Sequence, residues 1–219
     1  MLVRALRWLG AVTLLGLAGS VAVPTPAQAA PPLFQLPFEC GQQWKGTTGS
    51  GAHSTPWEID FNWGSGTADL GKPVLAAAAG TISIARYETT NGYGNRVVIR
   101  HQNTGYTTQY AHLEKFAPGL KVNDTVRQGQ LIGYVGASSA KYSLSPHLHY
   151  EVRNANVLQP AYFNGIRFGY PTQTVTSRNC GNNPKAGALR DVTGDGKSDL
   201  LAVDSSGNRM YRYAGSGTG

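Results

Sequence analysis

The chain has 219 residues, of which 41% are hydrophobic and 14% charged, and its formal net charge is +7. Its lysines and arginines are scattered rather than clustered, so the sequence does not indicate a nucleic-acid-binding protein. A scattered positive excess is typical of a solvated surface. Outside a bacterial cell it also favours residence on anionic wall polymers.

The first 29 residues have the features of a secretory signal peptide. Arg4 and Arg7 precede an apolar run from about Trp8 to Val23, and the small-residue motif Ala-Gln-Ala ends at residue 29. A transmembrane anchor is the alternative, but the run is short, interrupted by glycine and followed by two prolines. We therefore predict cleavage after residue 29, a secreted or wall-associated protein, and no remaining membrane span. Loss of the two arginines lowers the net charge to +5.

The two cysteines, Cys40 and Cys180, lie near the two ends of the segment 33–180. In an oxidising compartment, an even pair of cysteines predicts a disulfide. A metal site is disfavoured because neither cysteine is near a histidine in the sequence. The bond would tie the start of a domain to its end and stabilise it by roughly 4 to 5 kcal/mol in the chain-entropy model.

Short β-rich runs alternate with turns rich in Gly, Asn and Pro between residues 71 and 152. The runs are PVLAAAAGTISIARY, NRVVIRHQ, YTTQYAHL, QGQLIGYVG and HLHYEVR. TNGYGN and QNTGY have turn chemistry suited to hairpins, and GLKVNDTVRQGQLIG has a strand, turn, strand pattern. No amphipathic helix is convincing. We predict one mostly β, mostly antiparallel domain over about residues 33–180.

Two histidines, His147 and His149, are separated by one residue in the strand-like run HLHYEVR. On a strand they point to the same face, while the residues on either side of His149 point to a core. A pair of exposed strand histidines is the simple alternative. Asp60 lies between two apolar residues in EIDFN. A carboxylate in that setting needs a strong partner such as a metal or an arginine.

These residues can build a catalytic zinc site. His53, Asp60 and one of His147 and His149 would supply three ligands and leave an open position for water. Zinc lowers the pKa of a bound water toward about 7. The remaining histidines could take a proton or stabilise an oxyanion. His101, at the edge of a predicted hairpin, is expected to be structural or solvated.

From His53 to Val152 the motifs resemble the lysostaphin-type zinc metallopeptidases, which are peptidoglycan endopeptidases with a LytM-like β-fold. The motifs are the His…Asp segment, GKPVLAAAAGTI, GYGNRVVIRHQNTGYTTQYAHL, VRQGQLIGYVG and SPHLHYEV. The resemblance implies an antiparallel β-sheet peptidase domain with groove-forming loops. It also implies zinc ligands and a catalytic pair. The implied ligands are His53, Asp60 and His149, and the implied catalytic pair is His112 and His147.

The sequence departs from the family pattern in two ways. The common pattern is H-x-x-x-D, whereas six residues separate His53 from Asp60 here. Some family members use a tyrosine upstream of the first ligand to stabilise the transition state, and no tyrosine lies between residues 31 and 53. That role is vacant, is shared by the two catalytic histidines, or is filled from elsewhere.

Four further residues lie near the predicted site. Tyr93, Asn95 and Tyr142 are on predicted groove loops and are either substrate-contact residues or turn residues. Glu151 shares the strand face of the two histidines. It is either a partner for a ligand histidine or part of a surface salt bridge.

The C-terminal segment has a different character: residues 181–188 predict a linker, and 189–219 form a separate element. In DVTGDGKSD, oxygen atoms follow the spacing of a calcium loop, with Gly196 at the sharp turn, although Ala202 replaces the usual bidentate Glu. The possible ligands are Asp191, Thr193, Asp195, Lys197 through its carbonyl, and Asp199. The loop resembles FG-GAP or VCBS repeats. An Asp/Gly-rich turn without metal is the alternative, and one repeat indicates a truncated or degenerate array.

We therefore expect a secreted zinc endopeptidase that hydrolyses peptide cross-links of bacterial peptidoglycan. One alternative is a non-catalytic peptidoglycan-binding or regulatory protein on the same fold. Another is a calcium-dependent wall or glycan adhesion module led by the tail. A Gly-Gly bridge, a D-Ala to diamino-acid cross-link and a stem-peptide bond all remain open as substrates.

Overall fold

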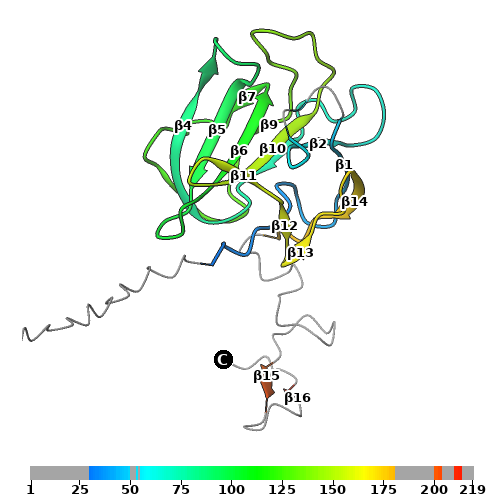
Figure 1. The fold of residues 1–219 in the computed structure, drawn as a ribbon, viewed down its shortest axis with the longest axis vertical. Coiled ribbons are helices and arrows are strands. Elements are labelled where there is room, and N and C mark those ends of the chain that lie inside the picture. The colour runs from blue at the N-terminus through cyan, green and yellow to red at the C-terminus, as the bar shows by residue number, and fades with distance from the viewer. Residues whose placement is uncertain (1–29, 50–52, 54, 181–199, 204–209, 214–219) are drawn as a thin grey trace, which may run out of the picture.

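The computed structural model describes residues 30–49, 53, 55–180, 200–203 and 210–213 (Figure 1). The predicted signal peptide, the linker and the proposed calcium ligands lie outside these residues. The strands are β1 (Gln43–Thr47), β2 (Ile59–Asn62), β3 (Pro73–Leu75), β4 (Gly80–Glu88), β5 (Gly94–Arg100), β6 (Tyr106–Leu113), β7 (Lys115–Phe116), β8 (Thr125–Val126), β9 (Leu131–Tyr134), β10 (Leu148–Asn154), β11 (Val157–Gln159), β12 (Tyr162–Phe163), β13 (Ile166–Arg167), β14 (Thr172–Thr176), β15 (Leu200–Val203) and β16 (Met210–Tyr213). Within the described ranges, no helix is long and apolar enough to cross a membrane.

A nine-stranded antiparallel sheet forms the body of the molecule. Its strand order is β14-β1-β2-β10-β6-β5-β4-β8, and β11 pairs with β10 beside this path. β3, β9 and β7 form a second sheet, and β12–β13 and β15–β16 form two-stranded pairs. The predicted hairpins form, because TNGYGN connects β4 to β5 and QNTGY connects β5 to β6. This architecture confirms the predicted antiparallel β fold.

Two predicted runs are divided between sheets. PVLAAAAGTISIARY forms β3 and β4, which belong to different sheets. GLKVNDTVRQGQLIG contributes β8, which pairs with β4, and β9, which pairs with β3 and β7. Gly80 marks a close approach, because a Cβ there would lie 2.6 Å from the Arg100 carbonyl oxygen. The apolar pattern therefore indicated strands correctly but carried no information about their partners.

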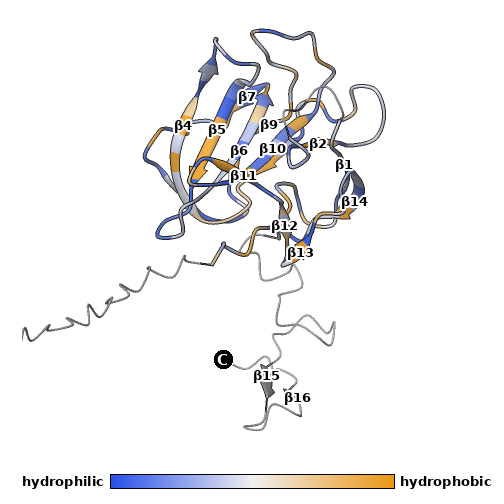
Figure 2. Ribbon diagram, in the orientation of Figure 1, coloured by the Kyte–Doolittle hydropathy of each residue, from blue (hydrophilic) through white to orange (hydrophobic). Residues whose placement is uncertain are grey.

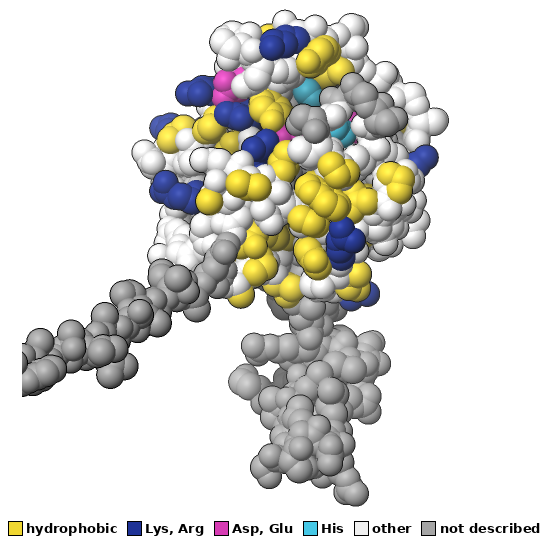
Figure 3. Space-filling view, in the orientation of Figure 1, with side chains coloured by type: hydrophobic (Ala, Val, Ile, Leu, Met, Phe, Trp, Pro, Cys, Tyr) yellow, Lys and Arg dark blue, Asp and Glu magenta, His cyan; other side chains and the backbone are white. Residues whose placement is uncertain are grey.

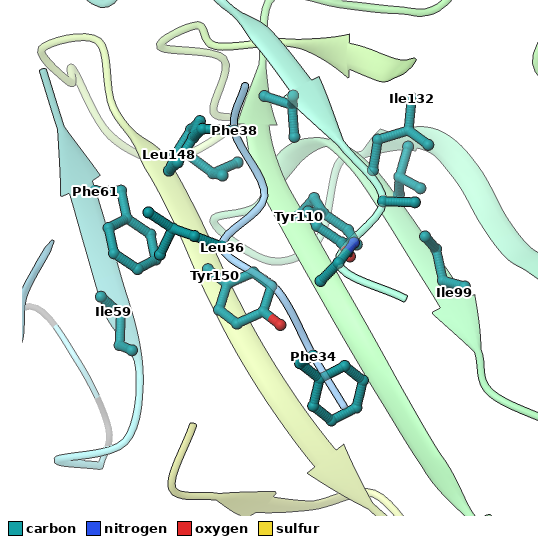
Figure 4. Close-up of a cluster of buried hydrophobic side chains, with 14 of the residues drawn as sticks. Phe34, Leu36, Phe38, Ile59, Phe61, Ile99, Tyr110, Ile132, Leu148 and Tyr150 are labelled. Atoms are coloured by element: carbon teal, nitrogen blue, oxygen red, sulfur yellow. The ribbon is translucent and has the colours of Figure 1, made fainter. Parts of the chain in front are cut away.

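The core lies on one face of the large sheet and is crossed by the extended segment 33–38 (Figure 4). Gln35 N–H donates to Ala77 O over 2.8 Å, and Leu75 N–H donates to Pro37 O over 2.9 Å. Large side chains from this segment and from the sheet are buried, and each stabilises the fold by about 1.5–3 kcal/mol relative to exposure. The largest are Trp44, Tyr110, Tyr150, Phe38, Phe61, Phe168 and Leu36.

The opposite face of the sheet carries polar side chains, and the alternation of hydropathy along the central strands is visible in Figure 2. In β10, Leu148 and Tyr150 enter the core, so His149 points to the other face. The register places His149 directly opposite Asp60 on β2 and opposite Ala111 on β6. Core packing on one face therefore fixes which polar residues meet on the other.

The predicted disulfide is present. Cys40 and Cys180 are joined, with their Cα atoms 4.6 Å apart and 140 positions apart in the sequence. The bond connects the segment before β1 to the end of the strand-rich region after β14. The covalent loop therefore encloses every strand that contributes to the candidate site.

Candidate metal and catalytic site

Three residues from two chain segments meet at the centre of the polar face. Asp60 Oδ1 is 3.0 Å from His149 Nδ1, and Asp60 Oδ2 is 3.1 Å from His53 Nε2. One ligand atom from each residue lies within 4.8 Å of the others. The structure thus brings together the three predicted ligands, although six residues separate His53 from Asp60.

The ring of His149 is held from both sides by carboxylates. Its Nε2 donates to Glu151 Oε1 over 2.9 Å, and its Nδ1 faces Asp60. Burial alone would lower the pKa of His149, but the hydrogen bonds with Asp60 and Glu151 outweigh it and raise the pKa to about 9. A metal would replace the Nδ1 proton and leave the Nε2–H bond to Glu151 intact.

Asp60 is held as a carboxylate. Burial acts to raise its pKa, but hydrogen bonds from His149 and His53 outweigh burial and keep the pKa well below its ordinary value. The second nitrogen of His53, Nδ1, is buried and has no hydrogen-bond partner among the described residues. The carboxylate of Asp60 suits a metal ligand, which must present a charged oxygen or a free lone pair.

The donor set fits zinc. Two imidazoles and one carboxylate form a common catalytic zinc set with one position left open. Ligand atoms on a tetrahedral zinc lie roughly 3.4 Å apart, given the usual zinc–ligand bond lengths. His149 Nδ1 lies 3.0 Å from Asp60 Oδ1 and His53 Nε2 lies 3.1 Å from the other oxygen, Oδ2, and one ligand atom from each residue lies within 4.8 Å of the others. The residues present therefore fit the ion that the sequence predicts.

The two predicted catalytic histidines lie beside this cluster, with ring centroids 4.8 Å apart. His112 Nδ1 donates to Ser138 O over 2.9 Å, and His147 Nδ1 donates to Ser145 O over 2.8 Å. In both rings the backbone contact places the proton on Nδ1 and leaves Nε2 with a lone pair. Burial, followed by the charges of His147 and His149, lowers the pKa of His112 to about 4.

His112 reaches the polar face through a β-bulge. Ala111, which pairs with His149, lies on the polar face. By simple alternation its neighbour His112 would point to the opposite, core face. The register shifts at this point: Asn95 pairs with Leu113 but Val97 pairs with Tyr110, so two residues of β6 oppose one of β5. The φ angle of His112 is 61°, an uncommon value for a residue other than glycine. The bulge re-aims the ring.

A groove of about 600 Å³ runs over the five site residues. Its walls come from two loops, one before β5 and one before β10, and histidine side chains are visible at the surface in Figure 3. Tyr93 and Tyr142 line the groove, as the sequence suggested. Asn95 does not, because its side-chain amide donates to the carbonyls of Leu113 and Glu114 and supports the turn.

The two wall loops are tied to each other by residues that the sequence analysis did not identify. Ser139 Oγ donates to Gly92 O over 2.8 Å, and Asn95 N–H donates to Ser138 Oγ over 2.8 Å. Ser138 Oγ in turn donates to Leu113 O over 2.7 Å. Serines in a Gly/Ala/Ser loop carry no local signal for this role, since the contacts exist only between distant segments.

Two other residues have clear positions. His101 is buried and structural, with Nδ1 2.8 Å from Ala79 O and Nε2 3.0 Å from Thr108 Oγ1. Glu151 is fully buried and contacts both His149 and Arg153, so it is a partner of the predicted ligand and also forms a salt bridge from a buried position.

Comparison with known proteins points to one family for this region. Residues 59–160 match the model of Peptidase family M23. This matched region contains Asp60, His112, His147 and His149, and His53 lies just before it. All strands from β2 to β11 fall inside it.

The matched region is similar to parts of several bacterial proteins. The DD-carboxypeptidase/endopeptidase Mpg of Neisseria meningitidis is 41% identical over 110 residues, which cover 50% of this chain and 23% of that protein. Lysostaphin of Staphylococcus simulans is 30% identical over 118 residues, which cover 52% and 23%. The L-Ala–D-Glu endopeptidase of Bacillus subtilis is 34% identical over 94 residues, which cover 41% and 28%. The chain thus spans about a quarter of the length of these proteins.

Among solved structures, the novel M23 metalloprotease pseudoalterin from the deep sea superposes with a TM-score of 0.50 at 23% identity. The match covers 63% of this chain and 82% of that one. At this identity the match shows a shared fold. The all-strand architecture is therefore similar to the fold of that protein.

Proposed function

We propose that this protein is a zinc metalloendopeptidase that hydrolyses peptide bonds in bacterial peptidoglycan. The observation that carries the proposal is the meeting of His53, Asp60 and His149 beside His112 and His147 at the floor of one open groove. A binding protein would need the groove but not this combination of a metal-ligating triad with two oriented bases.

In this proposal the triad binds the metal, and His112 and His147 handle the proton transfers. Zinc bound at the triad would act as a Lewis acid and lower the pKa of a water molecule toward neutrality. His112 and His147 line the groove, a backbone carbonyl holds the Nδ1–H of each ring, and His147 Nε2 lies 3.6 Å from Asp60 Oδ1. The Nε2 atoms of these two rings would accept a proton and return it to the leaving amine, or hydrogen-bond the developing oxyanion.

The substrate class rests on relatives and on shape. Three relatives of the matched region are described as endopeptidases or as lysostaphin, and the names of two specify D,D or L-Ala–D-Glu bonds. The groove here is open, with walls from two loops, and suits an extended peptide. We propose that residues 1–29 direct export, so that the enzyme meets its substrate outside the cell. The calcium loop of the tail stays a prediction.

The test is product analysis by mass spectrometry. The chain from residue 30 onward is incubated with purified peptidoglycans of different cross-link type, beside a His149→Ala variant. We expect new peptide termini that disappear in the variant and that a zinc chelator abolishes. A wild-type protein that holds zinc but cleaves none of these walls would favour a non-catalytic binding or regulatory protein.

A calcium-dependent adhesion module makes a different prediction. In that case, binding to intact walls would require calcium and would survive both the zinc chelator and the His149→Ala substitution. Sedimentation of the protein with purified walls, with and without each ion, separates this alternative from the enzyme.

A further inference from the structure

Glu151 is a carboxylate buried on the polar side of the sheet, with none of its surface exposed. Its oxygens accept hydrogen bonds from four side chains. His149 Nε2 and Tyr93 Oη share Oε1 at 2.9 and 2.8 Å, and Gln109 Nε2 and Arg153 Nε share Oε2 at 2.8 and 2.6 Å. A buried charge is tolerated only with such complete compensation, so this arrangement is highly constrained.

Besides His149, one of the four donors lines the groove. Tyr93 lines the groove, and its ring centroid is 5.7 Å from that of His149. Its backbone carbonyl accepts the His112 N–H over 2.9 Å, and the Arg96 guanidinium lies 4.9 Å over its ring. Tyr93 therefore contacts the groove, the predicted base and the partner of the predicted ligand at once.

The other donors fix Glu151 from below the groove. Arg153 is anchored by a second bond from Nη1 to Asn156 O, and Gln109 accepts from Arg96 Nη1 over 3.0 Å. Arg96 also pairs with Glu88 over 2.7 Å. This polar row runs across β4, β5, β6 and β10 and ends at His149. Gln109 and Arg153 are thus held by further contacts, and Tyr93 is the donor on Glu151, besides His149 itself, that also lines the groove.

We propose that Glu151 and Tyr93 are a positioning pair for the metal ligand. Glu151 holds the His149 proton on Nε2, so that Nδ1 is free to ligate. The Tyr93 hydroxyl holds Glu151 in the orientation that does so, and its ring forms part of the groove wall. The pair rests on the proposed function for its catalytic meaning, but its effect on metal affinity is independent of the substrate.

The experiment measures zinc dissociation constants by competition with a chromogenic chelator, and cleavage at saturating zinc, for the chain from residue 30. Glu151→Gln keeps the shape but removes the charge, and we expect it to weaken zinc binding by about 10- to 100-fold, as changes to partners of metal ligands do. Tyr93→Phe removes one oxygen atom and should weaken zinc binding several-fold. Excess zinc should restore part of the cleavage activity in both variants.

Tyr142→Phe is the matched control, because Tyr142 lies on the other wall of the same groove and is largely exposed. It should leave the zinc dissociation constant unchanged. The unfolding temperature of each metal-free variant shows whether the substitution affects folding. If Tyr93 only supports the fold, Tyr93→Phe will lower this temperature and leave the zinc dissociation constant at the wild-type value.

The positioning pair is overturned if Tyr93→Phe, and Glu151→Gln if it folds, bind zinc within twofold of wild type. Failure of the proposed function has a different signature. In that case, wild-type protein cleaves no peptidoglycan, while the zinc affinities of the variants still decide whether Glu151 and Tyr93 position His149.

Discussion

His149 Nδ1 lies 3.0 Å from Asp60 Oδ1, directly across the pairing of β10 with β2. The contact is dictated by the register, which the burial of Leu148, Tyr150 and Phe61 on the opposite face holds in place. A slip of one residue would move Asp60 into the core. The two residues are therefore fixed as partners by the hydrophobic core beneath them.

Replacing Asp60 by Asn tests the metal site. The amide has the same shape but lacks the charge, so we expect zinc affinity to fall by more than about 100-fold. Substituting a residue that only hydrogen-bonds to a metal ligand usually lowers affinity by about 10- to 100-fold. Zinc content after dialysis and circular dichroism give the measurement and the folding control. Stoichiometric zinc with an unchanged dissociation constant would rule out Asp60 as a ligand.

Replacing His112 by Asn tests the base. Asparagine tolerates the left-handed conformation that His112 adopts at φ 61°, so the bulge is preserved. We expect kcat to fall by about 10²- to 10⁴-fold, the usual contribution of a general acid–base group. Zinc content should stay at the wild-type level. Loss of zinc in this variant would instead place His112 among the ligands.

Replacing Gly94 by Ala tests the support of the groove wall. Gly94 has φ 59°, and an added Cβ would collide with the carbonyl of Ser138, which also accepts the Nδ1–H of His112. Gly66→Ala is the matched control, because Gly66 has φ 62° and nothing within 4 Å of an added Cβ. Urea unfolding and peptidoglycan cleavage should be measured for both variants.

The control isolates backbone strain. We expect Gly66→Ala to lose about 1–2 kcal/mol from the left-handed conformation alone. Gly94→Ala should lose a further ~1–3 kcal/mol from the collision and should also lower cleavage activity. Equal losses in the two variants, with full activity in both, would show that the Ser138 contact is dispensable.

His101 predicts a pH dependence of stability. Burial lowers its pKa below the ordinary 6.5, so the unfolded chain binds this proton at a higher pH than the folded one does. The contribution of His101 is therefore fully present above about pH 6.5 and is lost as the pH falls toward the folded-state pKa. Urea unfolding of His101→Gln should show a shallower loss of stability between pH 7.5 and 5 than wild type. Parallel curves would contradict this origin.

The disulfide predicts a large loss on removal. The double variant Cys40→Ser, Cys180→Ser should lose roughly 4 to 5 kcal/mol of unfolding free energy, because the bond closes most of the domain into one loop. Each single variant, with its remaining thiol blocked, is the control. A loss below about 1 kcal/mol would mean that the denatured chain stays compact without the bond.

The local pattern of the chain was sufficient for much of the fold. Period-2 alternation and turn chemistry predicted the hairpins β4–β5 and β5–β6, and the even pair of cysteines predicted the disulfide. The partners of β3, β8 and β9 could not be predicted, because apolar periodicity marks a strand without naming its neighbour.

The candidate site divides in the same way. The sequence by itself predicted that His147 and His149 share a face, from the period of a strand. In the structure β10 begins at Leu148 and His147 is held by an isolated bridge to Gly136, and both rings lie near Asp60 Oδ1. That Asp60 and His53 meet them depends on the register between β10 and β2. That His112 joins them depends on a bulge with no sequence signature. Only the tertiary structure decided the tautomer of His112, since the carbonyl of Ser138 reaches its ring from a segment 26 positions away. The groups that set the tautomers of His147 and His149 are local, because Ser145 and Glu151 each lie two positions from the ring they contact.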